Sequence, residues 1–157
     1  MVSPVPTILS LDLGTTTGWC MGGAPHMLVS GVMKLKPGRF DSSSMRFVRF
    51  LKQLNDLMAL EKPDFVVYEE VRRHAGTDAA HVYGGLLAHL QVWCDVNDIP
   101  YEGHPVGTIK KFATGKGNAD KDAMIAAVKA WGHRPADDNE ADAIALCRLK
   151  LAEWDAS

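Results

Sequence analysis

TILSLDLGTTTGW, residues 7–19, carries most of the information about the architecture of this chain. Its first half is almost entirely apolar, as in a buried strand, and the GTTTG that follows turns the chain away. Two further extended stretches, near Trp19–Met21 and Met27–Leu35, come at short spacing and predict a three-strand antiparallel meander. Because side chains alternate along a strand, Asp12 shares a face with Ser10 and its carboxylate reaches the end of the sheet.

Strands and helices alternate over the rest of the chain. The segments DFVVYEE (residues 64–70) and Pro100–His104 have the composition of strands. Apolar residues recur at helical spacing in four segments, which cover about Ser44–Leu60, a stretch from Thr77 through Trp93, Asp120–Trp131 and Asn139–Trp154. We therefore expect an α/β fold with a five-stranded mixed sheet, in which a three-strand antiparallel meander joins two parallel strands and helices flank both faces.

Length and composition predict a single domain over residues 1–157. The chain is 46% apolar and 23% charged, which is typical of a globular domain with a real core. The N-terminus MVSPVPTILS lacks the features of a signal peptide and no apolar stretch could span a bilayer, so we expect a cytoplasmic protein without a membrane partner. Its three cysteines, without paired spacing, predict buried thiols rather than disulfides or zinc ligands. A net charge of −2 argues against a protein that coats nucleic acid without regard to its structure or sequence.

Three acidic residues lie far apart in the sequence but on segments that can carry them to one point. Asp12 and Glu69 close two predicted strands, and Asp142 lies near the start of the last predicted helix. Either Asn139 or Asp138 shares the helix face of Asp142, whereas Glu140 does not. All-oxygen ligation suits Mg²⁺ or Mn²⁺, and two such ions support phosphodiester hydrolysis. Taken singly, each acid could instead be a solvated strand end or a helix-dipole partner.

At this point a family resemblance becomes visible. ILSLDLGTTTGW, PDFVVYEEV, TIKKFATGKGNADKDAM and NEADAIAL occur in the order and approximate spacing seen in RuvC-type Holliday junction resolvases of the ribonuclease H-like superfamily. The chain is most similar to the short RuvC-like proteins of phages and prophages, from about Ile8 to Leu149. The resemblance implies a ribonuclease H-like nuclease domain, a homodimer, and Mg²⁺-dependent nicking of branched DNA at symmetric positions.

The resemblance also assigns roles to single residues. Asp12, Glu69 and Asp142 match three metal-binding acids of the family, and Lys121 matches a lysine proposed to act near the scissile phosphate. Asn139 stands where cellular relatives carry an acid or histidine, so Asp138 is the alternative fourth ligand. A second departure is Arg72, because well-studied cellular members have an aromatic wedge there.

Basic residues near these motifs are candidate DNA contacts. Lys110, Lys111, Lys116 and Lys121 surround the loop TGKGNAD, whose glycines and following helix N-terminus could clamp a phosphate. Arg72 and Arg73, just after Glu69, could hold a second stretch of backbone. The alternative for both groups is a solvated loop.

The second predicted helix is the candidate dimer contact. Gly84 and Gly85 lie in its apolar stripe, where glycines cost helix stability unless a backbone approaches closely. The alternative is a helix packed on its own sheet.

Two other functions remain open from the sequence. LDLGTTTGW also resembles the first phosphate motif of the sugar kinase and actin superfamily, which would indicate a phosphotransferase. A catalytically weak branched-DNA-binding protein is the other alternative, because Asn139 and Arg72 depart from the cellular pattern.

Overall fold

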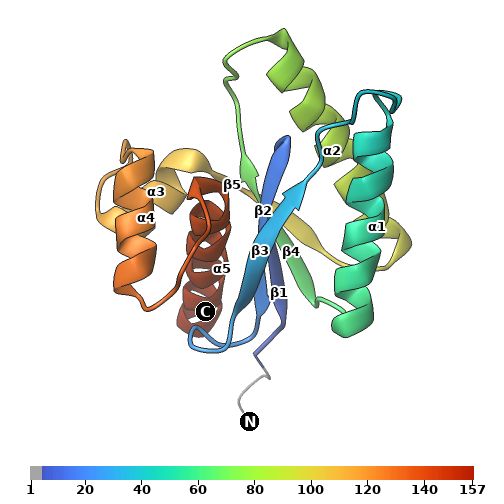
Figure 1. The fold of residues 1–157 in the computed structure, drawn as a ribbon. Helices are drawn as coiled ribbons and strands as arrows, with labels where there is room; N and C mark the ends of the chain where they lie inside the picture. The colour runs from blue at the N-terminus through green and yellow to red at the C-terminus, as the bar shows by residue number, and fades with distance from the viewer. Residues whose placement is uncertain (1–4) are drawn as a thin grey trace.

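The computed structural model describes residues 5–157 as an α/β fold built on one sheet (Figure 1). Residues 1–4 lie outside the described residues. They belong to the N-terminal stretch on which the prediction of a cytoplasmic location was based. The strands are β1 (Ile8–Asp12), β2 (Thr16–Gly22), β3 (Val29–Lys34), β4 (Phe65–Glu70) and β5 (Tyr101–Pro105). The helices are α1 (Met45–Leu60), α2 (Thr77–Val96), α3 (Val106–Thr114), α4 (Lys121–Ala130) and α5 (Asp138–Ala156).

The sheet has the order β3-β2-β1-β4-β5. Strands β1, β2 and β3 pair antiparallel, and β4 and β5 run parallel to β1. This confirms the predicted meander with two added parallel strands. Because β1, β3 and β4 run in the same direction, their carboxyl ends meet at one edge of the sheet.

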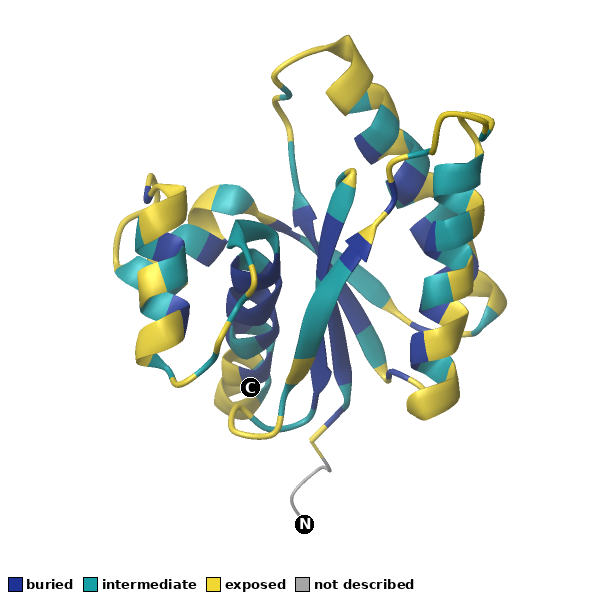
Figure 2. Cartoon of the chain, in the orientation of Figure 1, coloured by how far each residue is buried: buried dark blue, intermediate teal, exposed yellow. Residues whose placement is uncertain are grey.

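Alternation along the strands creates two cores, one on each face of the sheet. Leu9 and Leu11 of β1 pack in the core that contains α1 and α2. Ile8 of β1 and Val67 of β4 pack in the second core, which contains α5, α4 and α3. Helix α5 lies between the sheet and α4, so most of its middle is buried, as the dark blue ribbon in Figure 2 shows. The expectation of helices on both faces is confirmed.

Helix α3 was not predicted from the sequence. Its segment VGTIKKFAT is only nine residues long and contains one buried residue, Ile109, so its apolar pattern is too short to identify a helix. Gly107 and Thr108 are also weak helix formers. The helix ends at Gly115, whose φ of 85° is the left-handed conformation that favours glycine. Lys110 and Lys111 therefore lie on a helix, and only Lys116 belongs to the glycine-rich loop.

The three cysteines are free and buried, as predicted. Cys20 of β2 and Cys147 of α5 lie close enough for their thiols to hydrogen-bond, and this contact and burial raise the pKa of Cys20. Within residues 5–157, none of the helices has the length and apolar character required to traverse a lipid bilayer.

Candidate metal centre

Three carboxylates from three separate elements converge at the carboxyl edge of the sheet. Asp12 is the last residue of β1, Glu69 lies at the end of the adjacent strand β4, and Asp142 lies in the second turn of α5. One carboxylate oxygen from each lies within 4.8 Å of those of the other two. Glu69 is only 9% exposed. The structure thus brings together the three acids that the sequence singled out.

Without a bound cation, the three carboxylates are unfavourable in their ionised form. Burial raises the pKa of Asp12 well above its usual range, and the charge of Glu69 raises it further. Burial, then the charges of Glu69 and Asp138, raise the pKa of Asp142 to about 7, although Lys110 opposes the shift. Grouped acids of this kind hold their negative charge only when a cation compensates it. All donors are carboxylate oxygens, so the site fits a hard divalent cation.

Asp138 and Asn139 are placed differently relative to this cluster. The charge of Asp138 contributes to the raised pKa of both Asp12 and Asp142, but Asp138 is not one of the three acids whose oxygens lie within 4.8 Å of one another. The side-chain amide of Asn139 instead donates to a carboxylate oxygen of Asp137, at 3.3 Å. Both residues therefore stay candidates for the fourth oxygen donor.

Helix α5 is positioned by direct contact of its backbone with the sheet. Gly18 of β2 pairs with Asp12, and a Cβ atom at this glycine would overlap the carbonyl oxygen of Asn139. Two residue pairs further along, the buried hydroxyl of Ser10 donates to the carbonyl of Ala143 at 2.6 Å. The first turns of α5 are therefore fixed on β1 and β2, and the carboxylate of Asp142 is held over the end of β1.

Glu140 supports the same helix end from the other side. It is 7% exposed, and its carboxylate accepts hydrogen bonds from the Ser30 hydroxyl at 2.7 Å and the Ala136 N–H at 2.8 Å. Asp137 caps the helix by accepting from the Glu140 N–H at 2.9 Å. The sequence analysis correctly predicted that Glu140 does not join the carboxylate cluster. It gave no signal of the bond to β3, because that bond joins residues 110 positions apart.

The comparisons with known proteins support one family. No family model matches the chain. RuvC of Chlamydia muridarum, a crossover junction endodeoxyribonuclease, is 28% identical over 128 residues, which cover 77% of this chain and 75% of that protein. RuvC of Nitratidesulfovibrio vulgaris is 26% identical over 152 residues, which cover 91% of this chain and 90% of that protein.

Solved structures agree with the sequence matches. Thermus thermophilus RuvC in complex with a Holliday junction substrate superposes with a TM-score of 0.77 at 20% identity, covering 96% of this chain and 94% of that one. This chain is similar to RuvC in sequence and has a ribonuclease H-like fold. The yeast mitochondrial Holliday junction resolvase Ydc2 also superposes, with a TM-score of 0.66 at 12% identity and coverage of 99% and 83%. A phage or prophage origin of the RuvC-like chain stays a prediction.

The predicted basic residues of the RuvC-like chain lie on two segments near the carboxylates. Lys110 of α3 is close enough to Asp142 to lower its pKa, and Lys121 at the start of α4 lies 3.7 Å from a carboxylate oxygen of Asp138. Both lysines therefore stand beside the acidic cluster. The other predicted contacts, Lys111, Lys116, Arg72 and Arg73, are exposed, and Arg72 pairs with Glu70 at 3.1 Å.

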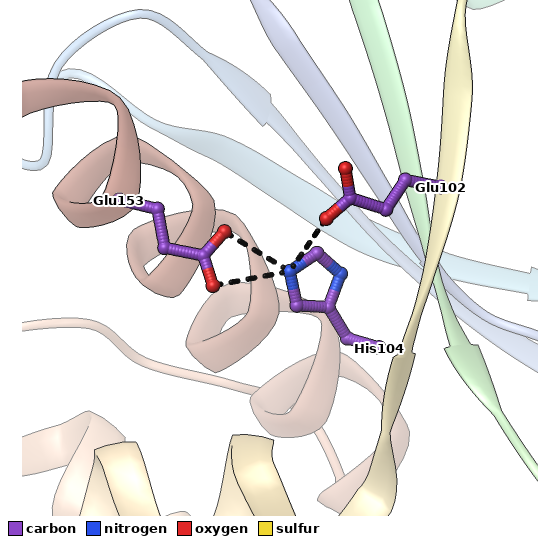
Figure 3. Close-up of side chains that lie close together, drawn as sticks. All are labelled: Glu102, His104 and Glu153. Carbon is purple, nitrogen blue, oxygen red and sulfur yellow. Dashed lines mark hydrogen bonds and ion pairs between the residues drawn. The ribbon is translucent and has the colours of Figure 1, made fainter. Parts of the chain in front are cut away.

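A second polar cluster of the RuvC-like chain was not predicted (Figure 3). His104 of β5 points its Nε2 atom at Glu102, 3.2 Å away, and at Glu153 of α5, 3.1 Å away. Lys150, which is 12% exposed, lies 3.2 Å from Glu102 and 3.7 Å from Glu153. Because Lys150 already supplies a positive charge between these carboxylates, the cluster reads as an ion-pair network that ties the edge strand to α5. The only signal in the sequence was the i, i+2 spacing of Glu102 and His104, which puts both on one face of a strand.

Proposed function

We propose that this chain is a metal-dependent, structure-selective endodeoxyribonuclease that cleaves phosphodiester bonds in branched DNA, Holliday junctions in particular. The observation that carries the proposal is the convergence of Asp12, Glu69 and Asp142 in a chain that resembles RuvC over most of its length. On this proposal residues 1–157 act as a single nuclease domain, and a cytoplasmic location stays a prediction.

In the proposed mechanism Asp12, Glu69 and Asp142 would hold the pair of Mg²⁺ or Mn²⁺ ions that two-metal hydrolysis needs, with Asp138 or Asn139 completing the oxygen set. The ions supply an activated water and charge against the leaving oxygen. Lys121, whose Nζ lies 3.7 Å from a carboxylate oxygen of Asp138, would stabilise the negative charge of the pentavalent phosphate. Because contacts with the sheet fix the position of α5, the metal-binding oxygens need to move little during the reaction.

DNA backbone contacts come from two basic segments in this proposal. Lys110, Lys111, Lys116 and Lys121 follow one stretch, and Arg72 and Arg73 follow another. Each neutralised phosphate lowers the slope of log affinity against log salt by about 0.9 on duplex DNA. The Lys116→Ala variant is expected to bind all branched substrates more weakly and with a smaller slope. An unchanged affinity and slope would remove Lys116 from the DNA surface.

A homodimer fits the exposed face of α2. Gly84, Ala88, Val92 and Val96 form an exposed stripe of small and apolar residues along this helix. An apolar groove of about 400 Å³ lies beside it, lined by residues of α2 and by Leu51 of α1. A Cβ atom at Gly84 would meet nothing, so this position is open to a second helix.

Gly85 serves a different contact from the one that the sequence suggested. A Cβ atom there would overlap the ring of Phe47 of α1, so this glycine allows close packing inside the chain. The ring of Phe47 in turn stacks on His89, with centroids 4.8 Å apart. Gly84 alone is therefore the glycine available to a two-fold helix pair.

Cleavage of a labelled four-way junction tests the proposed function. Wild type and the Asp12→Asn variant are incubated with Mg²⁺ or Mn²⁺, and Asp155→Asn, an exposed acid at the far end of α5, is the matched control. Symmetric nicks that disappear only in Asp12→Asn are the expected result. Junction binding without nicking by wild type would instead favour a DNA-binding protein, and ATP hydrolysis without either would favour a phosphotransferase. Normal cleavage by Asp12→Asn would show that the catalytic assignment is wrong.

A further inference from the structure

Phe40 is the most exposed large apolar side chain of residues 5–157, at 94%. It lies in the loop between β3 and α1, where the flanking residues Arg39 and Asp41 are charged. A single exposed apolar residue is common on protein surfaces and is no evidence by itself. The setting of this residue is what distinguishes it.

The loop around Phe40 is held in a closed turn. One carboxylate oxygen of Asp41 accepts from the Gly38 N–H and from the Arg49 guanidinium, both at 2.7 Å. The guanidinium of Arg39 lies 5.5 Å from the centre of the Phe40 ring. These contacts hold the backbone on both sides of Phe40, so the ring is presented to solvent from a defined turn.

This loop lies at the same edge of the sheet as the carboxylate cluster. It follows the carboxyl end of β3, which runs in the same direction as β1 and β4. Figure 1 shows the loop at the upper end of the molecule, to which β4 also runs. The Leu35 N–H donates to the Thr15 carbonyl at 2.9 Å, which ties the start of this connection to the turn just after Asp12.

A basic hollow of about 910 Å³ lies between this loop and the start of α2. Its lining includes Thr15, Ser43 and two cations, Lys36 and Arg46. Among residues 5–157, neither cation has a carboxylate within the 4.0 Å of an ion pair. Asp78 is the single acid in the lining. The hollow therefore combines hydroxyls with unpaired positive charge, which suits a phosphate backbone.

We propose that this hollow and Phe40 form a second DNA contact, in which Lys36 and Arg46 hold backbone phosphate and Phe40 stacks on a base that becomes unpaired at the branch point when the junction binds. The inference rests on the proposed function and extends it to a site outside the carboxylate cluster. Every base offers a π-face, so an exposed, fixed aromatic ring recognises an unpaired base without regard to sequence. In linear duplex the bases are already stacked on one another, so Phe40 contributes selectivity for the branch while the two cations contribute affinity for any DNA.

Binding measurements with four-way junction and linear duplex test this proposal, with Ca²⁺ in place of Mg²⁺ so that the DNA stays intact. Phe40→Ala is expected to weaken junction binding roughly 5- to 150-fold, the range that base stacking gives, and to leave duplex binding unchanged. Phe40→Trp is expected to restore it. Lys36→Ala combined with Arg46→Gln is expected to weaken binding to both DNAs and to reduce the salt slope by about 0.9 for each phosphate lost.

Leu60→Ala is the matched control, because Leu60 is an exposed apolar residue at the opposite end of α1. A junction carrying 2-aminopurine at the branch reports directly on the stacked base, and its fluorescence is expected to differ between wild type and Phe40→Ala. Equal junction binding by these two proteins would overturn the inference and leave the proposed function standing. An equal loss for junction and duplex, or a change of Phe40→Ala from dimer to monomer in sedimentation, would also overturn it. Failure of wild type to bind junctions at all would defeat both proposals.

Discussion

Replacing Asp142 by asparagine is expected to stabilise the metal-free protein while removing its activity. In the folded chain the pKa of Asp142 is raised from 3.8 to about 7, by burial and by the charges of Glu69 and Asp138. The unfolded chain releases this proton near pH 3.8, whereas the folded chain keeps it to about pH 7. The folded state therefore binds more protons in this window, and its stability falls as the pH rises from about 4 to about 7.

The size of the effect follows from the same pKa values. The difference between 3.8 and about 7, at about 1.4 kcal/mol for each pKa unit, corresponds to on the order of 4 kcal/mol. Because the side chain is partly exposed, solvent screening reduces the expected gain to about 2–4 kcal/mol. For a chain of this length that gain raises the melting temperature by about 4–15 °C at pH 8. Near pH 4 the carboxyl is protonated in the folded state and the gain is expected to be small.

Urea unfolding with EDTA present, followed by tryptophan fluorescence at pH 8 and pH 4, measures the gain. Asp155→Asn is the control, because it makes the same chemical change on an exposed acid of the same helix. A gain for Asp142→Asn at pH 8 that exceeds the control is the expected outcome. If the two variants have the same free energy of unfolding at pH 8, or if Asp142→Asn destabilises the protein, the carboxylates do not repel one another and the argument for a cation site fails.

Three further predictions concern the ions, the seat of α5 and the dimer. Mn²⁺ is expected to raise the melting temperature of wild type more at pH 8 than at pH 5, because at low pH the ions must displace protons from acids whose pKa is raised. It is expected to have little effect on Asp12→Asn. Scanning calorimetry with and without EDTA checks both expectations. Gly18→Ala is expected to cost at least about 2–3 kcal/mol of stability and to abolish cleavage, because its Cβ would overlap α5. Gly14→Ala is expected to be tolerated, because its Cβ would have its nearest neighbour at 3.6 Å. Urea unfolding and cleavage assays compare the two variants. Val92→Asp is expected to give folded monomers, and sedimentation that shows an unchanged dimer would remove the exposed face of α2 from the interface.

The parts of the fold that could be predicted are those with a strong local pattern. The apolar run before Asp12 and the β-branched run before Glu69 identify two central strands, and their shared direction places both carboxylates at one edge of the sheet. Helix α3 was not predicted because it is only nine residues long, has one buried residue and begins without a side-chain cap. A pattern this short cannot separate a short surface helix from a loop.

The contacts that position the candidate site were not predictable for a different reason. Ser10 and Ala143 are 133 residues apart, and nothing in either sequence neighbourhood specifies the other. Glu140 was identified only as pointing away from Asp142, and its bond to Ser30 depends on how α5 lies across β3. Local sequence predicts which acids can meet. The tertiary packing decides which neighbours hold them there.

The contact between Gly18 and Asn139 involves the main chain of Asn139, so the position of α5 does not depend on the side chains that could bind a metal. Since backbone atoms and a buried serine hydroxyl fix the helix, the side chains at positions 138 and 139 are free to change identity without moving Asp142. If the proposed function holds, single exchanges such as Asn139→Asp or Asn139→His would change the cation preference on an unaltered scaffold. On the proposed function, the first turn of α5 is the place where substitutions would change which metal the protein selects.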